Sequence, residues 1–397
     1  MRRYLQRALF LFAACLSVLF VAGAASAAAP IIDAAEAKAA IARGALVWDV
    51  RATPLYRKGH VPGAINIGDI GVVLRNPVTE DFIDTAQIEK LLGQAGLDTT
   101  REIVVYADRG SPYAHFGRYA LRYFGADKVS VLRDGIEGWQ AAGGALETAD
   151  ATRPAIALKL VERPELAVNT EEVIARAKAG SAQIIDARTS GEYAGNDVRA
   201  IRGGNIPGAV NIPYEMNWKD PETAAKLARR LVPDNGGAAL GSPEQLKALY
   251  ARLDPNKETV VYCQSGVRAA ETASVLETLG FKNIKVYDSS WLGYAARLDA
   301  PAANERFFNV GALNGRLAAM QRRIDENIDA VERNANKMAR VANRSNPLME
   351  MLGGFAVAGC LLYGGYSVVA LGATPGQFFS FMSAFLLATE PAKRLAR

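Results

Sequence analysis

Cys263 stands between an apolar run and a helix-forming segment, a setting in which a cysteine can act as a nucleophile. Residues 259–262 are typical of a strand, Gly266 permits a turn, and residues 269–279 are typical of a helix. The sulfur would then face backbone N–H groups and the positive end of a helix dipole, and both favour thiolate over thiol. Because thiolate is the nucleophilic form, we predict that Cys263 is catalytic. The alternative is a buried structural cysteine at a strand end.

The five residues after Cys263 are expected to hold the group that it attacks. Their backbone N–H groups would surround a transferred atom and stabilise its negative charge, as an oxyanion hole does. Two roles are open for Arg268: it could hold an anionic substrate through charge-assisted hydrogen bonds, or it could pin the loop to a neighbouring carboxylate. The predicted substrate-binding residues are Gln264, Ser265, Gly266, Val267 and Arg268.

The composition of the chain excludes several other functions. Its 397 residues leave room for two or three domains, and a net charge of +5 with 50% hydrophobic residues fits neither a nucleic-acid binder nor a disordered protein. The three cysteines and two histidines form no Cys/His cluster, and no phosphate-binding loop for ATP is present. We therefore expect no cofactor, no metal and no nucleic-acid partner.

The first 27 residues have the layout of a secretory signal peptide. Two arginines precede the apolar run 8–22, and Ala25-Ser26-Ala27 offers a cleavage site. An uncleaved membrane anchor is the alternative. Export would leave Cys263 as the only cysteine of the soluble part, a free thiol in an oxidising compartment. We therefore predict a periplasmic or exported protein, which its C-terminal segment could anchor to the inner membrane.

Two stretches of the chain follow one plan, in which strands alternate with helices. Each has a strand ending in Asp-x-Arg, a Pro-Gly turn leading into a second strand, a Val-Val-Tyr strand, and a short strand closed by an acidic turn. These segments are 46–51, 59–67, 103–107 and 131–135 in the first stretch, and 184–188, 204–212, 260–263 and 285–289 in the second. Helices are expected at 85–95, 113–124 and 244–253. The pattern predicts an α/β fold: two domains, each a mainly parallel sheet flanked by helices.

From about residue 30 to 320, the order of these motifs resembles the tandem-domain rhodaneses, the thiosulfate/3-mercaptopyruvate sulfurtransferase family, which carry sulfur as a cysteine persulfide. The Cys-x4-Arg spacing matches their active loop, whereas cysteine phosphatases use Cys-x5-Arg. The resemblance implies a small anionic sulfur donor and a thiol or cyanide acceptor. Arg268 favours thiosulfate, a dianion, over 3-mercaptopyruvate. Ala107 stands where the second repeat has Cys263, and alanine cannot attack sulfur, so the first repeat is expected to be catalytically silent.

Other residues of these motifs are expected to be structural. The resemblance implies that Asp186 and Arg188 support the site by bracing the fold through an ion pair. Trp291 is expected in the core, with a place in the pocket wall as the alternative. His60 and His115 are expected to be residues of a turn and of a helix.

The end of the chain has a different composition. Charged residues are frequent in 323–344, and residues 351–389 contain none. Residues 326–397 resemble the last two transmembrane helices of an ABC exporter, as in the segment Thr374-Pro375-Gly376-Gln377. Because four earlier membrane helices and the ATPase of such a transporter are missing, we interpret this tail as the result of a gene fusion or a chimeric open reading frame, in which it acts at most as an anchor. A buried hydrophobic hairpin of a soluble domain is the alternative. Basic residues on both sides of the hairpin would place both of its ends in the cytoplasm, in conflict with N-terminal export.

These observations give an expected domain order and two alternative functions. The expected segments are a signal peptide (1–27), a silent rhodanese-like domain (28–145), a linker (146–166), a catalytic rhodanese domain (167–302), an amphipathic helical segment (303–346) and a transmembrane hairpin (347–397). The favoured function is an exported sulfurtransferase that uses a Cys263 persulfide. The alternatives are a non-catalytic, membrane-tethered binding module and a remnant of an ABC transporter fusion.

Overall fold

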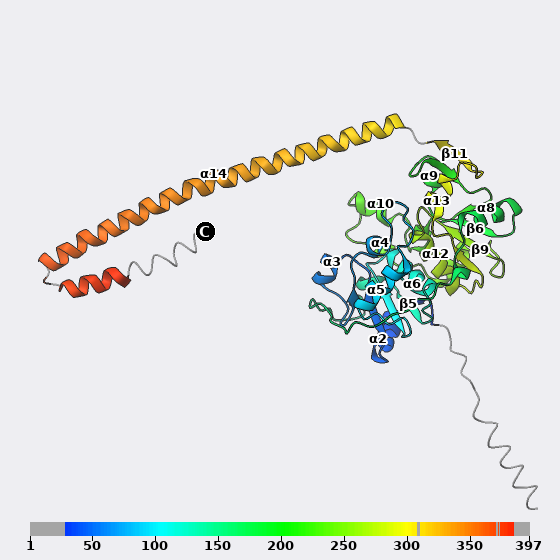
Figure 1. The fold of residues 1–397 in the computed structure, drawn as a ribbon, viewed down its shortest axis with the longest axis horizontal. Helices are drawn as coiled ribbons and strands as arrows, with labels where there is room; N and C mark the ends of the chain where they lie inside the picture. The colour runs from blue at the N-terminus through cyan, green and yellow to red at the C-terminus, as the bar shows by residue number, and fades with distance from the viewer. Residues whose placement is uncertain (1–27, 308–309, 371, 373, 385–397) are drawn as a thin grey trace, which may run out of the picture. The chain divides into compact units, whose positions relative to one another are not determined.

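The computed structural model describes residues 28–307, 310–370, 372 and 374–384, so the expected signal peptide lies outside the described residues. Residues 28–307 belong to one compact unit, and the described residues from 310 onward belong to another (Figure 1). Each unit is described by itself.

The first repeat is built on a five-stranded parallel sheet. Its spatial order is β1 (Ile31–Ile32), β5 (Val129–Leu132), β4 (Ile103–Tyr106), β2 (Leu46–Asp49) and β3 (Ile65–Asn66). The strands β2, β4 and β5 are buried along their whole length, which explains why their sequences are mainly apolar. The helices are α2 (Ala34–Ala42), α3 (Thr53–Lys58), α4 (Ile70–Val73), α5 (Thr85–Gln94), α6 (Tyr113–Tyr123) and α7 (Gly135–Ala141).

The second repeat has the same plan with a four-stranded parallel sheet. Its spatial order is β10 (Ile284–Val286), β9 (Thr259–Tyr262), β6 (Gln183–Asp186) and β8 (Val210–Asn211). The α-helices are α8 (Thr170–Ala179), α9 (Ser190–Tyr193), α10 (Thr223–Ala228), α11 (Pro243–Leu249), α12 (Val267–Thr278) and α13 (Ser290–Ala296). Short 3-10 helices lie at Pro164–Leu166, Tyr214–Asn217 and Gly236–Ala238. The predicted α/β fold, made twice around parallel sheets, is confirmed.

One pair of strands corrects a sequence-based prediction. β11 (Ala303–Phe307) pairs antiparallel with β7 (Arg202–Asn205), so residues 303–307 are not the start of a helical segment. The pairing is stabilised from the side chains as well, because Arg202 forms an ion pair with Glu305 at 2.6 Å. This ladder closes the second repeat.

The two repeats pack against each other through α6 and α12, which lie side by side (Figure 1). Arg118 and Arg122 of α6 each lie 2.9 Å from Glu277 of α12. Arg118 is buried, and burial lowers the pKa of its guanidinium, while Glu277 acts in the opposite direction. The interface therefore depends on a carboxylate that compensates a buried charge.

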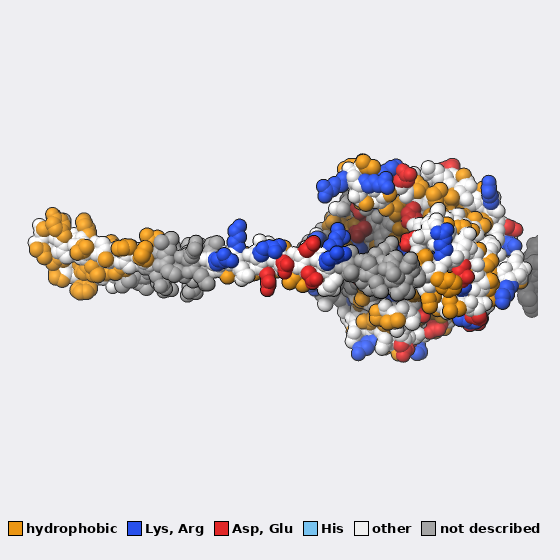
Figure 2. Space-filling view, turned by 90° about the horizontal axis from the view of Figure 1, so that it is seen from above, with side chains coloured by type: hydrophobic (Ala, Val, Ile, Leu, Met, Phe, Trp, Pro, Cys, Tyr) orange, Lys and Arg blue, Asp and Glu red, His pale blue; other side chains and the backbone are white. Residues whose placement is uncertain are grey.

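The second unit is dominated by one long helix, α14 (Val310–Ala370). It runs without a break across the expected boundary at 346/347. Met351–Ala370 is long and apolar enough to cross a membrane. Beyond Gly372, a short helix at 375–384 turns back, and Phe378 packs against Gly364. Figure 2 shows hydrophobic side chains gathered at this end of the unit and charged ones along the earlier part of α14. The arrangement is consistent with a membrane hairpin.

Candidate active site

A network at the carboxyl ends of the central strands fixes the framework of the site. In the second repeat, Arg188 pairs with Asp186 at 2.6 Å, the Tyr262 hydroxyl donates to Asp186 at 2.6 Å, and Arg188 donates to the carbonyl oxygen of Gly204 at 2.7 Å. The first repeat makes the same contacts with Arg51, Asp49, Tyr106 and Gly59. Both arginines are buried, so the Asp-x-Arg motif braces the fold.

Two further residues singled out in the sequence lie in the core. The Arg188 guanidinium stacks 4.5 Å from the ring centre of Trp291, whose indole N–H donates to the carbonyl oxygen of Arg202 at 2.9 Å. His60 is buried, stacks on Tyr56, and makes a 2.9 Å hydrogen bond to the carbonyl oxygen of Tyr56. Neither Trp291 nor His60 is placed to bind a substrate.

Cys263 follows β9 directly and is enclosed, with 1% of its surface exposed. The loop after it is tied to Ser290, whose Oγ accepts the N–H groups of Cys263 and Gly266 at 3.0 Å each. The same hydroxyl donates to the carbonyl oxygen of Tyr287 at 2.7 Å. Gly266 turns the chain at φ 84°, where a side chain would collide with Asp288. The turn therefore requires glycine.

The start of α13 sets the direction of the loop peptides. The carbonyl oxygens of Cys263 and Gln264 accept the N–H groups of Trp291 and Leu292, both at 3.0 Å. In a trans peptide the C=O and the following N–H point in opposite directions. The N–H groups of Gln264 and Ser265 are therefore directed away from α13, toward the other side of the loop.

Most of the backbone N–H groups predicted to bind the substrate are free to bind an anion. Within the described part of the chain, no hydrogen-bond acceptor contacts the backbone N–H groups of Gln264, Ser265, Val267 and Arg268. Gly266 is a correction to the prediction, because its N–H is already taken by Ser290. The last two of the four free groups belong to the first turn of α12, where the helix dipole also favours negative charge.

Arg268 is held by a carboxylate that the sequence analysis did not single out. Both terminal nitrogens of Arg268 donate to Glu192 at 2.8 Å. Burial alone would raise the pKa of Glu192, but the hydrogen bonds and charge of Arg268 outweigh it and lower that pKa to about 2. Burial lowers the pKa of Arg268, whereas Glu192 and the nearby Cys263 raise it, with a net rise. Of the two roles left open for Arg268, the structure shows the one that pins the loop.

Three more residues near the loop were also missed. The side-chain amide of Gln264 donates a hydrogen bond to the carbonyl oxygen of Arg199 at 3.1 Å. The guanidinium of Arg199 is half exposed and lies 3.3 Å from Glu192. Tyr214 and Tyr113 lie close enough for the charge of Cys263 to raise their pKa values, although burial is the larger cause. Because Tyr113 begins α6, the first repeat reaches the surroundings of Cys263.

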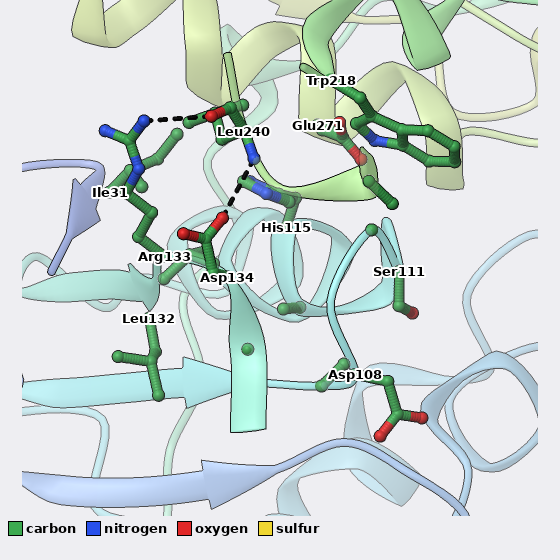
Figure 3. A pocket seen from close by; sticks show the side chains of 16 residues that line it. Ile31, Asp108, Ser111, His115, Leu132, Arg133, Asp134, Trp218, Leu240 and Glu271 are labelled. Atoms are coloured by element: carbon green, nitrogen blue, oxygen red, sulfur yellow. Dashed lines mark hydrogen bonds between the residues drawn. The ribbon is translucent and has the colours of Figure 1, made fainter. Parts of the chain in front are cut away.

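The corresponding loop of the first repeat lacks a nucleophile. Ala107 follows β4, and a cavity of about 30 Å³ lies beside it, lined by both repeats (Figure 3). His115 enters this cavity from α6 and Glu271 from α12. Burial, and less strongly Arg118, lowers the pKa of His115 to about 3, and burial raises the pKa of Glu271 well above its usual range. His115 is therefore neutral near pH 7, and burial favours the neutral form of Glu271.

A segment of the second repeat closes this loop. The Leu240 N–H donates to Asp134 at 3.0 Å, and Arg133 donates to the Leu240 carbonyl oxygen at 3.1 Å, as seen in Figure 3. Among the residues that the structure describes, no group of three or more His, Cys, Asp or Glu side chains could hold a metal ion.

Two family models match the chain. The model for the Rhodanese-like domain matches residues 33–142 and 169–297, and the model for the ABC transporter transmembrane region matches residues 313–391. The first therefore covers both repeats and more than half of the chain.

Known proteins with the same plan cover both repeats as well. A putative thiosulfate sulfurtransferase of Mycobacterium leprae is 33% identical over 63% of this chain and 87% of its own length. The thiosulfate sulfurtransferase of Corynebacterium glutamicum is 33% identical over 62% of this chain and 80% of its own. The structure of SseA from Escherichia coli, described as a 3-mercaptopyruvate sulfotransferase, superimposes with a TM-score of 0.55 at 28% identity and covers 66% of this chain and 98% of that one. EanB shares the fold, with a TM-score of 0.58 at 20% identity over 69% of this chain and 68% of its own.

Proposed function

Because the chain belongs to the rhodanese family, we propose that it is an exported sulfurtransferase that carries sulfane sulfur on Cys263. In the first step the Cys263 thiolate attacks the outer sulfur of thiosulfate, the S–S bond of the donor breaks, and its electron pair leaves with sulfite. A persulfide then remains on Cys263. In the second step cyanide or a thiol takes the outer sulfur, and the thiolate of Cys263 is restored.

The observation that supports this proposal most directly is the set of free N–H groups next to Cys263. The outer sulfur of a persulfide carries negative charge, and fixed donors in a site that excludes water stabilise such charge strongly. The N-terminus of α12 adds its dipole to the same side of the loop. A structural cysteine would not need four backbone donors without acceptors.

We propose thiosulfate as a better donor than 3-mercaptopyruvate. Arg268 and Arg199 lie beside the loop, and two carboxyl groups, Glu192 and Glu215, act on Arg268. The half-exposed guanidinium of Arg199 suits a dianion better than a monoanion. Two of the relatives are named as thiosulfate sulfurtransferases, whereas SseA is described as a 3-mercaptopyruvate sulfotransferase. For the tail, we propose that α14 and the helix after it attach the enzyme to a membrane.

Mass spectrometry of the full chain, purified in dodecyl maltoside, tests the first step. After incubation with thiosulfate, the peptide that contains Cys263 should gain about 32 Da, the mass of one sulfur atom, and lose it again on addition of cyanide. Cys360 is the matched control, because it is the other free cysteine in the described residues and lies in the apolar part of α14.

Turnover of the variants then tests the assignment of the nucleophile. Cys263→Ser should form no thiocyanate, whereas Cys360→Ser should keep the wild-type rate. A parallel assay with 3-mercaptopyruvate compares the donors. Absence of the adduct together with unchanged turnover of Cys263→Ser would support the non-catalytic binding module instead. Equal or faster turnover of 3-mercaptopyruvate would overturn the donor assignment alone.

A further inference from the structure

A second cavity, of about 290 Å³, lies between the two repeats, and none of its lining residues belongs to the loop 263–268. Phe82, Tyr119 and Tyr123 line it from the first repeat, and Asn169, Glu172 and Asp288 are among the residues that line it from the second. Its volume is close to the lower end of the range for small-molecule sites. Asn169 is exposed at its edge, so a solute can reach it.

The side formed by the first repeat is aromatic. The ring centres of Phe82 and Tyr123 are 5.8 Å apart and those of Phe82 and Tyr119 are 6.2 Å apart, with the rings of each pair within 26° of parallel. Tyr119 is 7% exposed, and its hydroxyl has no hydrogen-bond partner in the structure. Aromatic rings carry a negative electrostatic potential on their faces. Where a ring face borders the cavity, this side favours a cation over an anion.

The opposite side carries carboxylates. Asp288 lines this side, its Oδ1 is enclosed next to Gly266 without a hydrogen-bond partner, and burial raises the pKa of this carboxyl to about 7. Glu172 contributes a second carboxyl, one oxygen of which accepts the N–H of Asn169 at 2.9 Å. Asp81 lies next to the cavity as well, held by the hydroxyl of Ser289 at 2.8 Å.

The cation whose charge acts on Asp288 does not neutralise it by contact. Arg75 lowers the pKa of Asp288 through its charge, but no carboxylate of the described residues lies within ion-pair distance of Arg75. Its guanidinium instead donates to the carbonyl oxygen of Glu80 and stacks 4.9 Å from the ring centre of Phe116. Two carboxyl groups, Asp288 and Glu172, thus line one side of the cavity. Arg176 lies 3.8 Å from Glu172, whereas Asp288 has no cation within ion-pair distance in the part of the chain that the structure describes.

We propose that this cavity binds a small organic cation, of the size and type of a quaternary ammonium compound. The rings of Phe82, Tyr119 and Tyr123 supply cation–π attraction and apolar contact, and Asp288 and Glu172 supply the counter-charge. A hydrated inorganic cation gains little from three aromatic rings, and an anion would be repelled by the carboxylates. An uncharged ligand would leave Asp288 without compensation.

Titration of the full chain, in dodecyl maltoside, with choline and with 3,3-dimethylbutan-1-ol tests the proposal by calorimetry. The two molecules have nearly the same shape, and only choline carries a charge. We expect choline to bind saturably at one site at pH 8, with at least about tenfold higher affinity than the alcohol. Equal affinity would show an apolar pocket, and no saturable binding of choline would show no site; either result overturns the proposal.

Two pairs of variants locate the binding. Tyr123→Leu should weaken choline binding about tenfold, whereas Tyr193→Leu makes the same change outside the cavity and should not. Asp288→Asn should weaken it as well, whereas Glu244→Gln removes an exposed carboxylate of α11 and should not. Wild-type affinity in Tyr123→Leu would contradict the assignment. If a cavity variant fails to fold, the comparison of choline with its neutral analogue still decides the question in the unmodified protein.

Discussion

Glu192 accepts a hydrogen bond from each terminal nitrogen of Arg268, both at 2.8 Å, and only 1% of its surface is exposed. The pair joins α9 to the first turn of α12 and so fixes the loop that starts at Cys263. Arg268 therefore influences Cys263 through the position of the loop and through its charge, and each of its two terminal nitrogens already donates one hydrogen bond to Glu192.

Glu192→Gln should impair both stability and sulfur transfer. Removing one partner of a buried ion pair leaves an uncompensated charge, and we expect a loss of about 3 kcal/mol in the free energy of unfolding. The kcat/KM for thiosulfate should fall roughly tenfold to a hundredfold, because the loop is no longer fixed. Denaturant titration and steady-state kinetics measure the two effects.

The double variant Glu192→Gln, Arg268→Met separates the two roles of Arg268. If the arginine mainly pins the loop, its loss should cost little more once Glu192 is gone, so the effects of the two changes should not add. Additive losses in kcat/KM would instead show that Arg268 binds the donor independently of Glu192.

Ser290→Ala tests the anchor behind the loop. The change removes the acceptor for two backbone N–H groups and leaves both buried without a partner. We expect the free energy of unfolding to fall by about 2 kcal/mol, and persulfide formation to slow in proportion to the loss of loop order. Ser289→Ala is the control, because its hydroxyl contacts Asp81 and not the loop. An equal effect of both variants would argue against a specific role for Ser290.

His115 should make the protein less stable in mild acid. Its pKa is lowered to about 3 by burial, whereas an unfolded histidine titrates near 6.5, so the unfolded chain binds the extra proton as the pH falls. The stabilisation is complete above pH 6.5 and is lost progressively below it. Between pH 7.5 and 5 the wild type should lose about 2 kcal/mol more than His115→Gln. Tryptophan fluorescence measures this, since all four tryptophans lie within residues 28–307; equal slopes would contradict the prediction.

Asp288 should have the opposite pH dependence. Its pKa is raised to about 7 by burial, above the value near 3.9 of an unfolded aspartate, so stability falls as the pH rises from about 4 to 7. Asp288→Asn should therefore be more stable than the wild type at pH 8, by up to about 4 kcal/mol, and no more stable at pH 4. Asp299→Asn is the control of opposite sign, because Arg297 lowers the pKa of Asp299. Thermal melts at both pH values distinguish the two variants.

The regular elements were predictable because their signals are local. Buried parallel strands such as Ile103–Tyr106 and Thr259–Tyr262 are continuous apolar runs, and the helices that follow them have ordinary helical sequences. The short strand Ala303–Phe307 was mistaken for part of a helix. It carries charged residues, lies at an edge, and gains its structure only from pairing with β7.

The partners of the loop could not be predicted, because their signals are not local. Glu192 stands in a capping box with Thr189, which in a sequence indicates only the start of a helix. Its contact with Arg268, 76 positions later, exists only because the tertiary fold brings α9 next to the start of α12. Nothing in the sequence around Ser290 indicates that its hydroxyl accepts hydrogen bonds from two backbone N–H groups.

The carbonyl groups of Cys263 and Gln264 accept hydrogen bonds from backbone N–H groups at the start of α13. The peptide dipoles that face an incoming sulfur are therefore oriented by folding itself, and little reorganisation should accompany each turnover. Donors should then differ in rate mainly through the bond that each must break, and only slightly through any adjustment of the protein around them.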